Sequence, residues 1–494
     1  MLCERLLSDA GLECPEHLRG RDVTGVVTDS RQVFKDCIFV CICGTLRDGH
    51  AYVRDAIEAG AAVIVAEKSR GVCEGGAAII YVDNTRLIAS LLYNAWYKSP
   101  ASGLKIIGVT GTNGKTSTAL MMLSIFEGAG YPCGFLGTVG YFSAGRRPIA
   151  DAQMTTPDPE TLYRCLAQMK SDGVEYVFME VSSHALAQSR VAAIEFDTAV
   201  FTNLTEDHLD FHGDMKTYYK AKKILFSQCR RAVVNIDDPA GRVIFRALDG
   251  ETVDKKSCSL ERGDFCALLP KVRNMGGSEY ALKTANGIHR VFLPLDGDFQ
   301  IMNSLEAVAV AIMHGISIEV IRNSLLGMGV VPGRMEKLRL HSKQSFDLFI
   351  DYAHTPDALE KLLQSARAIK EDRGKIILVF GCGGERDRDK RRVMGQIASR
   401  FADMTVITSD NSRGEDPQSI IKEILQGIDK ERPYAVIADR KEAIEYALCQ
   451  YARPGDIVLL AGKGHENYSI DSAGKHCFDE KEIVKNALKK LYDN

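Results

Sequence analysis

The chain alternates short apolar runs, rich in β-branched residues, with longer stretches in which apolar residues recur every three or four positions. The first pattern is typical of buried parallel strands, and the second is typical of helices that cover a sheet. The strand-like runs are VVTDSRQV, CIFVCICG, KIIGVT, YVFMEV, TAVFTNL, RAVVNI, FDLFIDYA, KIILVFGCG, DMTVITSD, YAVIAD and DIVLLAGKG. Because strand–helix alternation produces parallel sheets, the sequence predicts an α/β protein.

Two breaks divide this pattern into three blocks. Residues 98–103 read KSPASG and residues 331–333 read VPG, and both segments are typical of linkers. A chain of 494 residues is also too long for one ordinary core. We expect three domains: an α/β N-terminal domain at 1–99, a central domain with a mostly parallel, P-loop-type sheet at 100–331, and a Rossmann-like C-terminal domain at 332–494.

Residues 252–300 differ from the surrounding α/β pattern. They are charged and glycine-rich, and the segment EYALKTANGIHRVFLPL predicts a hairpin. The sequence does not indicate what residues 252–290 do.

Composition excludes several classes of function. A net charge of −3 gives no electrostatic reason to expect nucleic-acid binding. No apolar run approaches the roughly 18–20 residues that span a bilayer, so membrane insertion is not expected. The N-terminal segment MLCERLLSDAGLECPEHLRG contains acids and lacks the apolar core of a secretory signal. The 14 cysteines form no CxxC pair and no zinc-spaced cluster, so we expect free thiols in a reducing cytoplasm.

The most informative short segment is GVTGTNGKTS, at residues 108–117 between a predicted strand and a predicted helix. Backbone N–H groups of a glycine-rich turn that opens a helix bind phosphate oxygens, a lysine adds charge, and the next hydroxyl can ligate Mg²⁺. The residues in these roles are Gly111, Gly114, Lys115 and Thr116. Val109 stands where the general pattern has its first glycine. The position between a strand and a helix favours nucleotide binding over a chance turn.

Two further strands end in polar residues that suit a metal-bound nucleotide. These residues are Glu180, Ser182, Ser183 and His184 after YVFMEV, and Asn203, Asp207, His208 and His212 after TAVFTNL. A capped turn with solvated acids would also explain the second loop taken alone. Because the carboxyl ends of parallel strands meet at one edge of a sheet, we expect both loops near the glycine-rich turn.

A family resemblance emerges from the order of the motifs along the chain. They read GTNGKTS, TTPD, EVSSHAL, FTNLTEDHLDFHGD, YYKAKKILF, NIDDP, PGRME, DYAHTPD, GCGGERD, DNSRGEDP and GKGHE. Together they resemble the Mur ligases, ATP-dependent amide-forming enzymes of peptidoglycan precursor synthesis. The resemblance covers nearly the whole chain. It is strongest to members that add a diamino acid to UDP-N-acetylmuramoyl-L-alanyl-D-glutamate through an acyl phosphate. It implies a cytoplasmic monomer that uses ATP and Mg²⁺.

The resemblance also implies a metal and catalytic centre. The catalytic residues would be Lys115, Glu180, His208 and Lys222, and the metal ligands would be Thr116, Glu180, His208 and carbamylated Lys222. Carbamylation converts an ammonium into an anion with two oxygens, which a metal ion attracts. CO₂ reacts only with the neutral amine, so the site must lower the pKa of Lys222. Without the resemblance, three solvated lysines on one helix face would be the simpler interpretation of YYKAKKILF.

For ATP the resemblance implies residues from two domains. They are Gly111, Thr112, Asn113, Gly114, Lys115, Thr116, Ser117, Asn303, Arg334, Asp351 and His354. Asn303 would contact adenine, although Phe299-Gln300 stands where the family has a Phe-Asn pair. The residues from the last block would close over ATP, so we expect domain closure to assemble the site. A helix-capping histidine is the alternative interpretation of His354.

The nucleotide precursor would bind the first two blocks. The implied residues are Ser30, Thr155, Thr156, Ser182, Gln188 and Arg190, with the segments DSR and CGTLRDGH (Gly44, Asp48, His50) at the uridine end. Arginine and hydroxyl donors suit a dianionic, sugar-rich ligand.

The incoming amino acid would bind the last block. The implied residues are Arg386, Asp410, Asn411, Arg413, Gly462 and Glu466. Members that add meso-diaminopimelate typically read Asp-Asn-Pro-Arg where this chain reads Asp-Asn-Ser-Arg, and lysine-adding members lack that arginine. Arg413 would pair with the second carboxylate of diaminopimelate, a group that lysine lacks. Ser412 in place of proline loosens the turn, so L-lysine stays an alternative, as does a solvated loop role for Arg413.

Other functions fit the sequence less well. Folylpolyglutamate synthase, a related ligase, lacks an N-terminal block like 1–99, and DNSRGEDP argues against the Mur ligase that adds D-alanyl-D-alanine. A non-catalytic nucleotide-binding regulator on the same fold is also conceivable, because fold does not determine function. Such a protein would be expected to have lost Lys115, Glu180 or Lys222, and all three are present.

Overall fold

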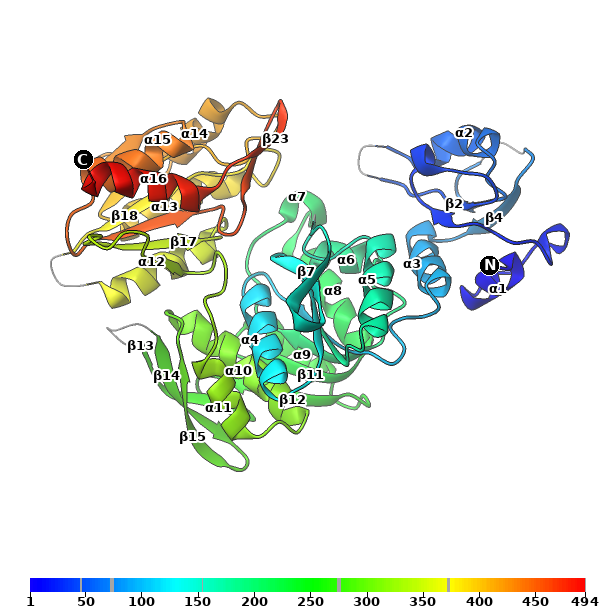
Figure 1. Cartoon of the computed structure of the whole chain (residues 1–494), viewed down its shortest axis with the longest axis horizontal. Helices are drawn as coiled ribbons and strands as arrows, with labels where there is room; N and C mark the ends of the chain where they lie inside the picture. The colour runs from blue at the N-terminus through cyan, green and yellow to red at the C-terminus, as the bar shows by residue number, and fades with distance from the viewer. Residues whose placement is uncertain (45–46, 72–74, 153, 273–276, 371–373, 494) are drawn as a thin grey trace. The chain divides into compact units, whose positions relative to one another are not determined.

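The computed structural model describes residues 1–44, 47–71, 75–152, 154–272, 277–370 and 374–493 (Figure 1). These residues form a sheet of four strands, one of eleven, one of six and a two-stranded ribbon. The α/β class is confirmed, with one major sheet in each of the three predicted blocks.

The chain divides into two compact units. Unit 1 comprises Met1–Thr110, Gly130–Ala199 and Ala221–Arg231, and unit 2 comprises Gly111–Ala129, Val200–Lys220 and Ala232–Asn494. Both units take part of the predicted central block, so the boundaries at 99 and 331 stay a prediction.

The first sheet lies in unit 1 and is parallel throughout. Its strands, in spatial as well as chain order, are β1 (Val26–Val27), β2 (Ile38–Val40), β3 (Val63–Glu67) and β4 (Ala78–Val82). The α-helices of this region are α1 (Cys3–Asp9), α2 (Val53–Glu58) and α3 (Thr85–Trp96). Phe39 and Ile64 lie in its core.

The predicted strand VVTDSRQV is mostly wrong. Only Val26–Val27 of this run forms a strand, and Ser30–Gln32 forms a 3₁₀ turn. The carboxylate of Asp29 accepts a hydrogen bond from the backbone N–H of Arg31, which caps this turn at 3.0 Å. A local side-chain cap therefore replaces the strand ladder here.

The eleven-stranded sheet is parallel at its centre and antiparallel at its ends. Its order is β15-β14-β13-β12-β11-β10-β5-β9-β6-β7-β8. The strands are β5 (Lys105–Thr110), β6 (Cys133–Gly137), β7 (Gly140–Ser143), β8 (Arg147–Ala150), β9 (Tyr176–Glu180), β10 (Phe196–Phe201), β11 (Cys229–Asn235), β12 (Asp254–Ser259), β13 (Phe265–Val272), β14 (Ser278–Thr284) and β15 (Gly287–Leu293). β14 and β15 pair antiparallel, so the predicted hairpin is confirmed.

The α-helices of the same region are α4 (Lys115–Gly128), α5 (Pro159–Ser171), α6 (Ser183–Ala187), α7 (Leu209–His212), α8 (Met215–Lys223), α9 (Pro239–Ala247), α10 (Asp298–Met313) and α11 (Ile318–Leu326). In unit 2, α4 packs against α10 and α11 (Figure 1). In unit 1, α5 packs against α3. All five residues of β9 are buried, as expected of a central parallel strand.

The six-stranded sheet lies in unit 2, and its order is β16-β17-β21-β18-β19-β20. The strands of this part of the chain are β16 (Glu336–Leu338), β17 (Asp347–Asp351), β18 (Ile376–Phe380), β19 (Met404–Ile407), β20 (Tyr434–Val436) and β21 (Ile457–Ala461), and the ribbon is β22 (Tyr468–Asp471) with β23 (Gly474–Cys477). The α-helices are α12 (Pro356–Ile369), α13 (Asp389–Phe401), α14 (Pro417–Leu425), α15 (Arg440–Glu445) and α16 (Glu480–Tyr492). Only β16 runs antiparallel to its neighbour in this sheet.

Several helices begin at a capping side chain followed by proline. Asp158, Asp238, Thr355 and Asp416 each accept backbone N–H groups of the first turn, and a proline follows each of them. Proline suits this position because its missing N–H would have no partner within the helix. These caps place each helix start at the carboxyl end of the preceding strand, where the loops carry the candidate site residues.

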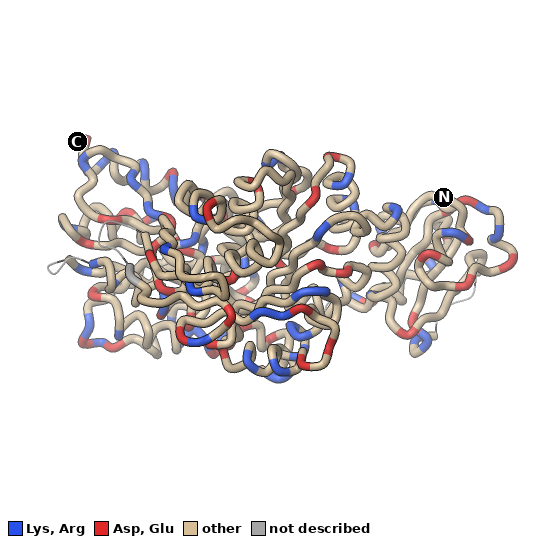
Figure 2. Tube along the Cα trace, turned by 90° about the horizontal axis from the view of Figure 1, so that it is seen from below, with Lys and Arg blue, Asp and Glu red and all other residues tan. Residues whose placement is uncertain are grey.

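Charges of both signs are interspersed along the trace in Figure 2. Among the helices within the described ranges, none is long and apolar enough to cross a membrane.

Candidate active site

The glycine-rich segment 111–114 forms the predicted turn between β5 and α4. Gly111 and Gly114 have φ angles of 154° and 88°, which L side chains rarely adopt. A Cβ at Gly111 would lie 1.8 Å from Thr202 Oγ1, and a Cβ at Gly114 would lie 2.4 Å from Asn303 Oδ1. Both positions therefore require glycine, for conformation and for space. The turn also brings the predicted adenine-contacting residue Asn303 against the loop.

The end of β10 holds the loop in place within unit 2. Asn203 accepts the N–H of Asn113 on its side-chain oxygen and the N–H of Thr112 on its backbone carbonyl, both at 2.9 Å. Thr202 Oγ1 donates to the carbonyl of Asn113 at 2.6 Å. The loop is therefore rigid before any phosphate arrives.

Lys115 and Thr116 open α4 with their polar atoms on the loop side. Lys115 Nζ donates to the carbonyls of Gly111 and Thr112, each at 2.9 Å. Thr116 is 2% exposed, and its hydroxyl accepts from Arg334 Nη2 at 3.2 Å. Arg334 and Thr116 are 218 residues apart, so the structure joins the first and last parts of the predicted ATP site. Ser117, also predicted for ATP, is buried beside them.

A second contact also joins the loop to the last block. The Asn113 side-chain amide donates to Asp357 Oδ2 at 2.8 Å, and Asp357 lies in the first turn of α12. Asp357 was not among the residues predicted for the ATP site.

Asp351 is the last residue of β17, and His354 follows the strand in the same unit. Asp351 accepts the backbone N–H groups of Met335 and Ala353, both at 2.7 Å, so it fixes the segment that carries Arg334. His354 Nδ1 lies 2.8 Å from the carbonyl of Tyr352 and must donate to it. Burial, with nearby Lys390, lowers the pKa of His354 to about 4. The imidazole is therefore neutral near pH 7.

His208 lies at the start of α7 with a φ of 56°. Its Nε2 is 3.3 Å from Asp207 Oδ2, and Asp207 is 5% exposed. Burial alone would raise the pKa of Asp207, but His208, His354 and Lys390 together lower it. Asp207 therefore stays anionic near pH 7 despite its burial.

In unit 1, Glu180 ends β9 and is completely buried. Thr138 donates to both of its carboxylate oxygens, from the backbone N–H at 2.8 Å and from the hydroxyl at 3.0 Å. The same hydroxyl lies 3.1 Å from Thr155 Oγ1. Thr138 thus fixes the orientation of the carboxylate.

The predicted precursor residues form one hydrogen-bonded network around Glu180. The Thr156 hydroxyl lies 2.8 Å from the carbonyl of Glu180 and 2.9 Å from the N–H of Ser182, which donates to it. Arg190 donates to the carbonyl of Thr156 at 3.0 Å and to Gln188 Oε1 at 2.6 Å. Five of the six residues predicted for the precursor are therefore connected.

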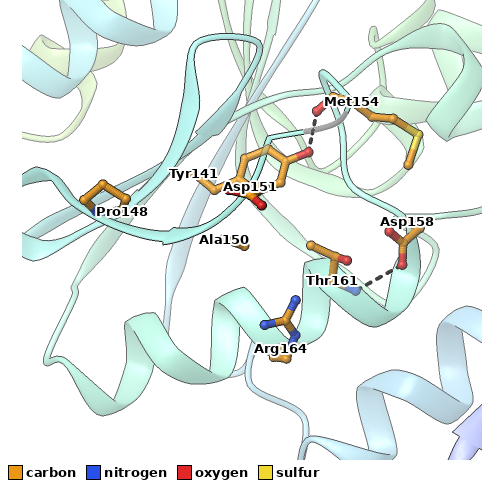
Figure 3. A pocket seen from close by; sticks show the side chains of 8 residues that line it. All are labelled: Tyr141, Pro148, Ala150, Asp151, Met154, Asp158, Thr161 and Arg164. Atoms are coloured by element: carbon orange, nitrogen blue, oxygen red, sulfur yellow. Dashed lines mark hydrogen bonds between the residues drawn. The ribbon is translucent and has the colours of Figure 1, made fainter. Parts of the chain in front are cut away.

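A pocket of about 530 Å³ lies beside this network (Figure 3). It is lined by Tyr141, Pro148, Ala150, Asp151, Met154, Asp158, Thr161 and Arg164. Met154 connects the two features, because its sulfur lies 3.2 Å from Arg190 Nη1 and its carbonyl accepts from the Tyr141 hydroxyl. The lining carries charges of both signs, a positive charge on Arg164 and a negative charge on Asp151.

Ser30, the sixth predicted precursor residue, lies in the 3₁₀ turn after β1. Helix α3 of the N-terminal region contacts the Glu180 network elsewhere in unit 1. Ser90 on α3 donates to the carbonyl of Arg190 at 3.1 Å and lies 2.8 Å from the Tyr163 hydroxyl on α5. In the segment CGTLRDGH, Thr45 and Leu46 lie outside the described residues.

Lys222 on α8 is 1% exposed, whereas its neighbours Lys220 and Lys223 are exposed. Among the three lysines, the one that the family motif places at the carbamylation position is thus the buried one. Its carbamylation stays a prediction.

The predicted metal ligands fit Mg²⁺ chemically. Mg²⁺ prefers hard oxygen donors. Thr116 offers a hydroxyl, Glu180 a carboxylate already oriented by Thr138, and a carbamate on Lys222 would add two oxygens. Thr116 and His208 belong to unit 2, and Glu180 and Lys222 belong to unit 1, so their convergence on one ion stays a prediction.

The predicted amino-acid residues gather after β19 and β21, in unit 2. The Asn411 side chain donates to Glu466 Oε2 at 2.8 Å and accepts from Lys463 Nζ at 3.0 Å. Lys463 Nζ also lies 3.5 Å from Asp410 Oδ1. A Cβ at Gly462 would lie 2.5 Å from Asp410 Oδ2, which requires glycine there. Burial and the charge of Asp410 raise the pKa of Glu466.

Arg413 lies beside Asn411 of this group. Its Nη1 donates to the carbonyls of Gly384 at 2.8 Å and Asn411 at 3.2 Å. Burial, followed by the charge of nearby Arg386, lowers its pKa. Two neighbouring guanidinium groups repel each other, and a carboxylate between them would relieve that repulsion.

The loops that carry the two arginines approach each other closely. A Cβ at Gly384 would lie only 1.9 Å from the carbonyl oxygen of Ser412. Ser412 is buried, at 4% exposed, and the loosening of the turn by this serine stays a prediction. The Gly384 N–H donates to the carbonyl of Asn411 at 2.9 Å.

Several residues that contact the predicted site residues or act on them electrostatically were not predicted from the sequence. They are Thr138, Thr202, Asp357, Lys390, Arg391, Glu415 and Lys463. Thr202 lies within the predicted run TAVFTNL, directly after β10, so its position at a strand end could have identified it. Thr138 directly follows β6, a strand that was not predicted. The others contact the site through partners that are distant in sequence.

Comparisons with known proteins agree across the whole chain. Residues 22–97 match the Mur ligase family catalytic domain, residues 109–311 the Mur ligase middle domain, and residues 333–464 the Mur ligase glutamate ligase domain.

Individual relatives extend this agreement. The chain is 41% identical, over 94% of each sequence, to UDP-N-acetylmuramoyl-L-alanyl-D-glutamate–2,6-diaminopimelate ligase 1 of Clostridium acetobutylicum. It is 42% identical to the corresponding ligase of Gloeobacter violaceus, over 99% of this chain and 98% of that one. A solved structure of a ligase of the same name is similar with a TM-score of 0.70 at 28% identity, over 99% of both chains. The chain therefore belongs to the Mur ligase family.

Proposed function

We propose that this protein is an ATP-dependent ligase that adds meso-diaminopimelate to UDP-N-acetylmuramoyl-L-alanyl-D-glutamate during peptidoglycan precursor synthesis. The names of the relatives at 41% and 42% identity support this substrate pair, because the similarity extends over nearly the full length of each chain.

The reaction joins a carboxylate to an amine, and a carboxylate is a poor electrophile. ATP first transfers its γ-phosphoryl group to the D-glutamyl carboxylate, which gives an acyl phosphate and ADP. The amine of diaminopimelate then attacks the acyl carbon, the C–O bond to phosphate breaks, and the ammonium proton is lost. The protein contributes mainly by positioning the reactants and neutralising charge.

The nucleotide end of the reaction fits the loop at 111–114. Its backbone is held by Thr202 and Asn203, and Lys115 and Arg334 bring two positive charges to the place where the β- and γ-phosphates would lie. Bound Mg²⁺ would neutralise phosphate charge, with Thr116, Glu180, His208 and carbamylated Lys222 as its proposed ligands.

The precursor end fits the network of Thr155, Thr156, Ser182, Gln188 and Arg190. Arg190 and the three hydroxyls suit a pyrophosphate and sugar. The pocket in Figure 3 adds polar side chains next to Met154, and we assign it to the muramoyl-peptide part of the same precursor. Ser30 would contact the uridine end.

The observation that supports the choice of amino acid is that Asp410 and Glu466, whose charges are shared with Lys463, lie close enough to Arg413 to influence it electrostatically. Glu466 and Asp410 suit the distal ammonium of the diamino acid, and Asn411 and Gly462 shape the space around it. Arg413, close to Arg386, suits the second carboxylate. L-Lysine has the ammonium but lacks that carboxylate, so it would leave the arginines without a partner.

We further propose that the enzyme works as a monomer in the cytoplasm, where both ATP and UDP-linked precursors are available. Nucleic acid and membrane are not expected partners, given the net charge of −3.

The test is phosphate release from ATP in the presence of UDP-N-acetylmuramoyl-L-alanyl-D-glutamate, with diaminopimelate or L-lysine supplied separately. We expect release with diaminopimelate at a kcat/KM at least about tenfold above that with lysine. Release with lysine alone would refute the proposed specificity. No release with either amine, and release with a folate and glutamate instead, would replace the proposal with a folylpolyglutamate synthase-like activity.

A further inference from the structure

One arginine in unit 2 is completely buried, although it is not among the residues predicted to bind the incoming amino acid. Arg391 lies in the first turn of α13 and is 0% exposed. Its guanidinium contacts Glu415 twice, with Nη1–Oε2 and Nη2–Oε1 distances of 2.9 and 3.0 Å. It also contacts Glu423 Oε2 at 2.8 Å and donates to the carbonyl of Gly383 at 3.1 Å.

The geometry of this contact is specific to arginine. A planar guanidinium meets both oxygens of a carboxylate at once, which a lysine ammonium cannot do. The hydrogen bonds from Arg391 lower the pKa of Glu415 to about 2. Glu415 therefore remains charged at any pH at which the enzyme would work, and the pair remains intact.

The pair joins the two loops that position Arg413. Glu415 follows Arg413 by two residues and accepts the backbone N–H of Glu385 from the facing loop. Arg391 holds the carbonyl of Gly383 in that facing loop, and Arg413 is held by the next carbonyl, that of Gly384. Arg391 and Arg413 thus donate to successive carbonyls of one loop. Arg391 does so from inside the fold, and Arg413 does so from the side of Asn411.

We propose that Arg391 and Glu415 are positioning residues for the choice of amino acid: they set the loop at 383–385 so that the Arg413 guanidinium faces the second carboxylate of the diamino acid. This proposal rests on the proposed function. It predicts that loss of the pair weakens recognition of that carboxylate and leaves the nucleotide and precursor sites unchanged, because neither Arg391 nor Glu415 contacts them.

The experiment compares Glu415→Gln and Arg391→Lys with Glu423→Gln. Glu415→Gln keeps the shape of a side chain that is 22% exposed, so folding should be preserved. Glu423→Gln is the matched control, because it removes the other carboxylate on Arg391 but leaves the loop contacts in place. KM is measured separately for diaminopimelate, ATP and the nucleotide precursor, and kcat/KM is measured for lysine.

We expect both test variants to raise the KM for diaminopimelate about tenfold or more, with the other two KM values within about threefold of wild type. The ratio of kcat/KM for diaminopimelate to that for lysine should fall about tenfold. Glu423→Gln should change these values by less than about threefold.

Equal effects on all three KM values, or a fall in kcat alone, would show a merely structural role and overturn the proposal. An unchanged diaminopimelate KM in Glu415→Gln would do the same. A wild-type enzyme that uses lysine but not diaminopimelate would instead refute the proposed function, so the two failures are distinguishable.

Discussion

The guanidinium of Arg334 donates a hydrogen bond to the hydroxyl of Thr116 across 218 residues of sequence, with an Nη2–Oγ1 distance of 3.2 Å. The same guanidinium lies over the Tyr352 ring, 4.5 Å from its centroid. A hydroxyl oxygen has two lone pairs, so Thr116 can accept from Arg334 and still ligate a metal ion. This hydrogen bond therefore places a cation from the last block beside the proposed metal ligand.

The first prediction follows from this shared hydroxyl. Thr116→Ala should lower kcat about 100-fold and raise the Mg²⁺ concentration needed for half-maximal rate, because it removes a metal ligand and the acceptor of Arg334. Thr116→Ser keeps the hydroxyl and should retain activity within about fivefold. Mg²⁺ titrations of ADP release would measure both effects. A Thr116→Ala enzyme with the wild-type Mg²⁺ dependence would contradict the assignment.

A second prediction concerns the buried lysine of α8. Lys222→Ala should abolish ligation, because the proposed carbamate would be lost, whereas Lys223→Ala should stay within about twofold of wild type, because Lys223 is exposed. Wild type and Lys223→Ala should lose activity in CO₂-free buffer and regain it when bicarbonate is added. Rates before and after bicarbonate addition are the measurement. Equal activity in the presence and absence of CO₂ would argue against a carbamate.

The third prediction tests Arg413 itself. Arg413→Ala should raise the KM for diaminopimelate at least about 30-fold and leave the KM of the nucleotide precursor nearly unchanged, since only the second carboxylate loses its partner. Arg388→Ala serves as the control, because Arg388 is an exposed arginine paired with Glu423 at 2.6 Å. Steady-state kinetics with each substrate varied in turn would decide. Parallel increases in both KM values would refute the role.

The fourth prediction concerns stability and pH. Glu306 lies on α10, completely buried, and its Oε2 accepts from the Thr118 hydroxyl of α4 at 3.1 Å, while its Oε1 has no hydrogen-bond partner among the described residues. Burial raises the pKa of Glu306 well above 4.5. The folded protein therefore keeps a proton that the unfolded chain releases above pH 4.5, so this group's contribution to stability falls as pH rises toward the folded-state pKa.

Glu306→Gln removes that proton uptake and retains a group that can accept from Thr118. Its melting temperature should exceed that of wild type at pH 8, and the advantage should shrink as pH falls toward 5. The underlying slope is about 1.4 kcal/mol per pH unit within that window. Glu319→Gln, at an exposed position on α11, is the control and should show no such trend. A constant difference between Glu306→Gln and wild type from pH 5 to 8 would contradict the prediction.

The sequence was most informative where one physical signal dominates. The loop at 111–114 was predictable because an apolar strand, glycines that a side chain would disrupt, and a helix follow one another directly. Lys222 could be selected among three lysines only through the motif register, since helix periodicity alone does not say which lysine the fold buries. The predicted strand after Val26 was wrong because the Asp29 cap is a short-range interaction that alternation does not reveal.

The residues that support the site could not be predicted from the sequence in the same way. Arg391 contacts Glu415 and Glu423, which are 24 and 32 residues away on other elements. No spacing rule connects them, because their proximity depends on how α13 and α14 pack. Glu306 lies in the second half of α10, where the residues from 305 to 313 are otherwise apolar, and its raised pKa follows from complete burial against α4. The contacts of Arg391 and the burial of Glu306 both depend on tertiary packing, which the local sequence pattern does not reveal.

The close approach of Gly384 to the Ser412 carbonyl also limits how such a protein could evolve. Any larger residue at 384 would push apart the two segments that carry Arg386 and Arg413, so substitution of this glycine is sterically disfavoured, whereas the side chains around it can vary. A lineage that changes its cell-wall cross-linking amino acid would therefore have to do so by exchanging side chains on an unchanged backbone.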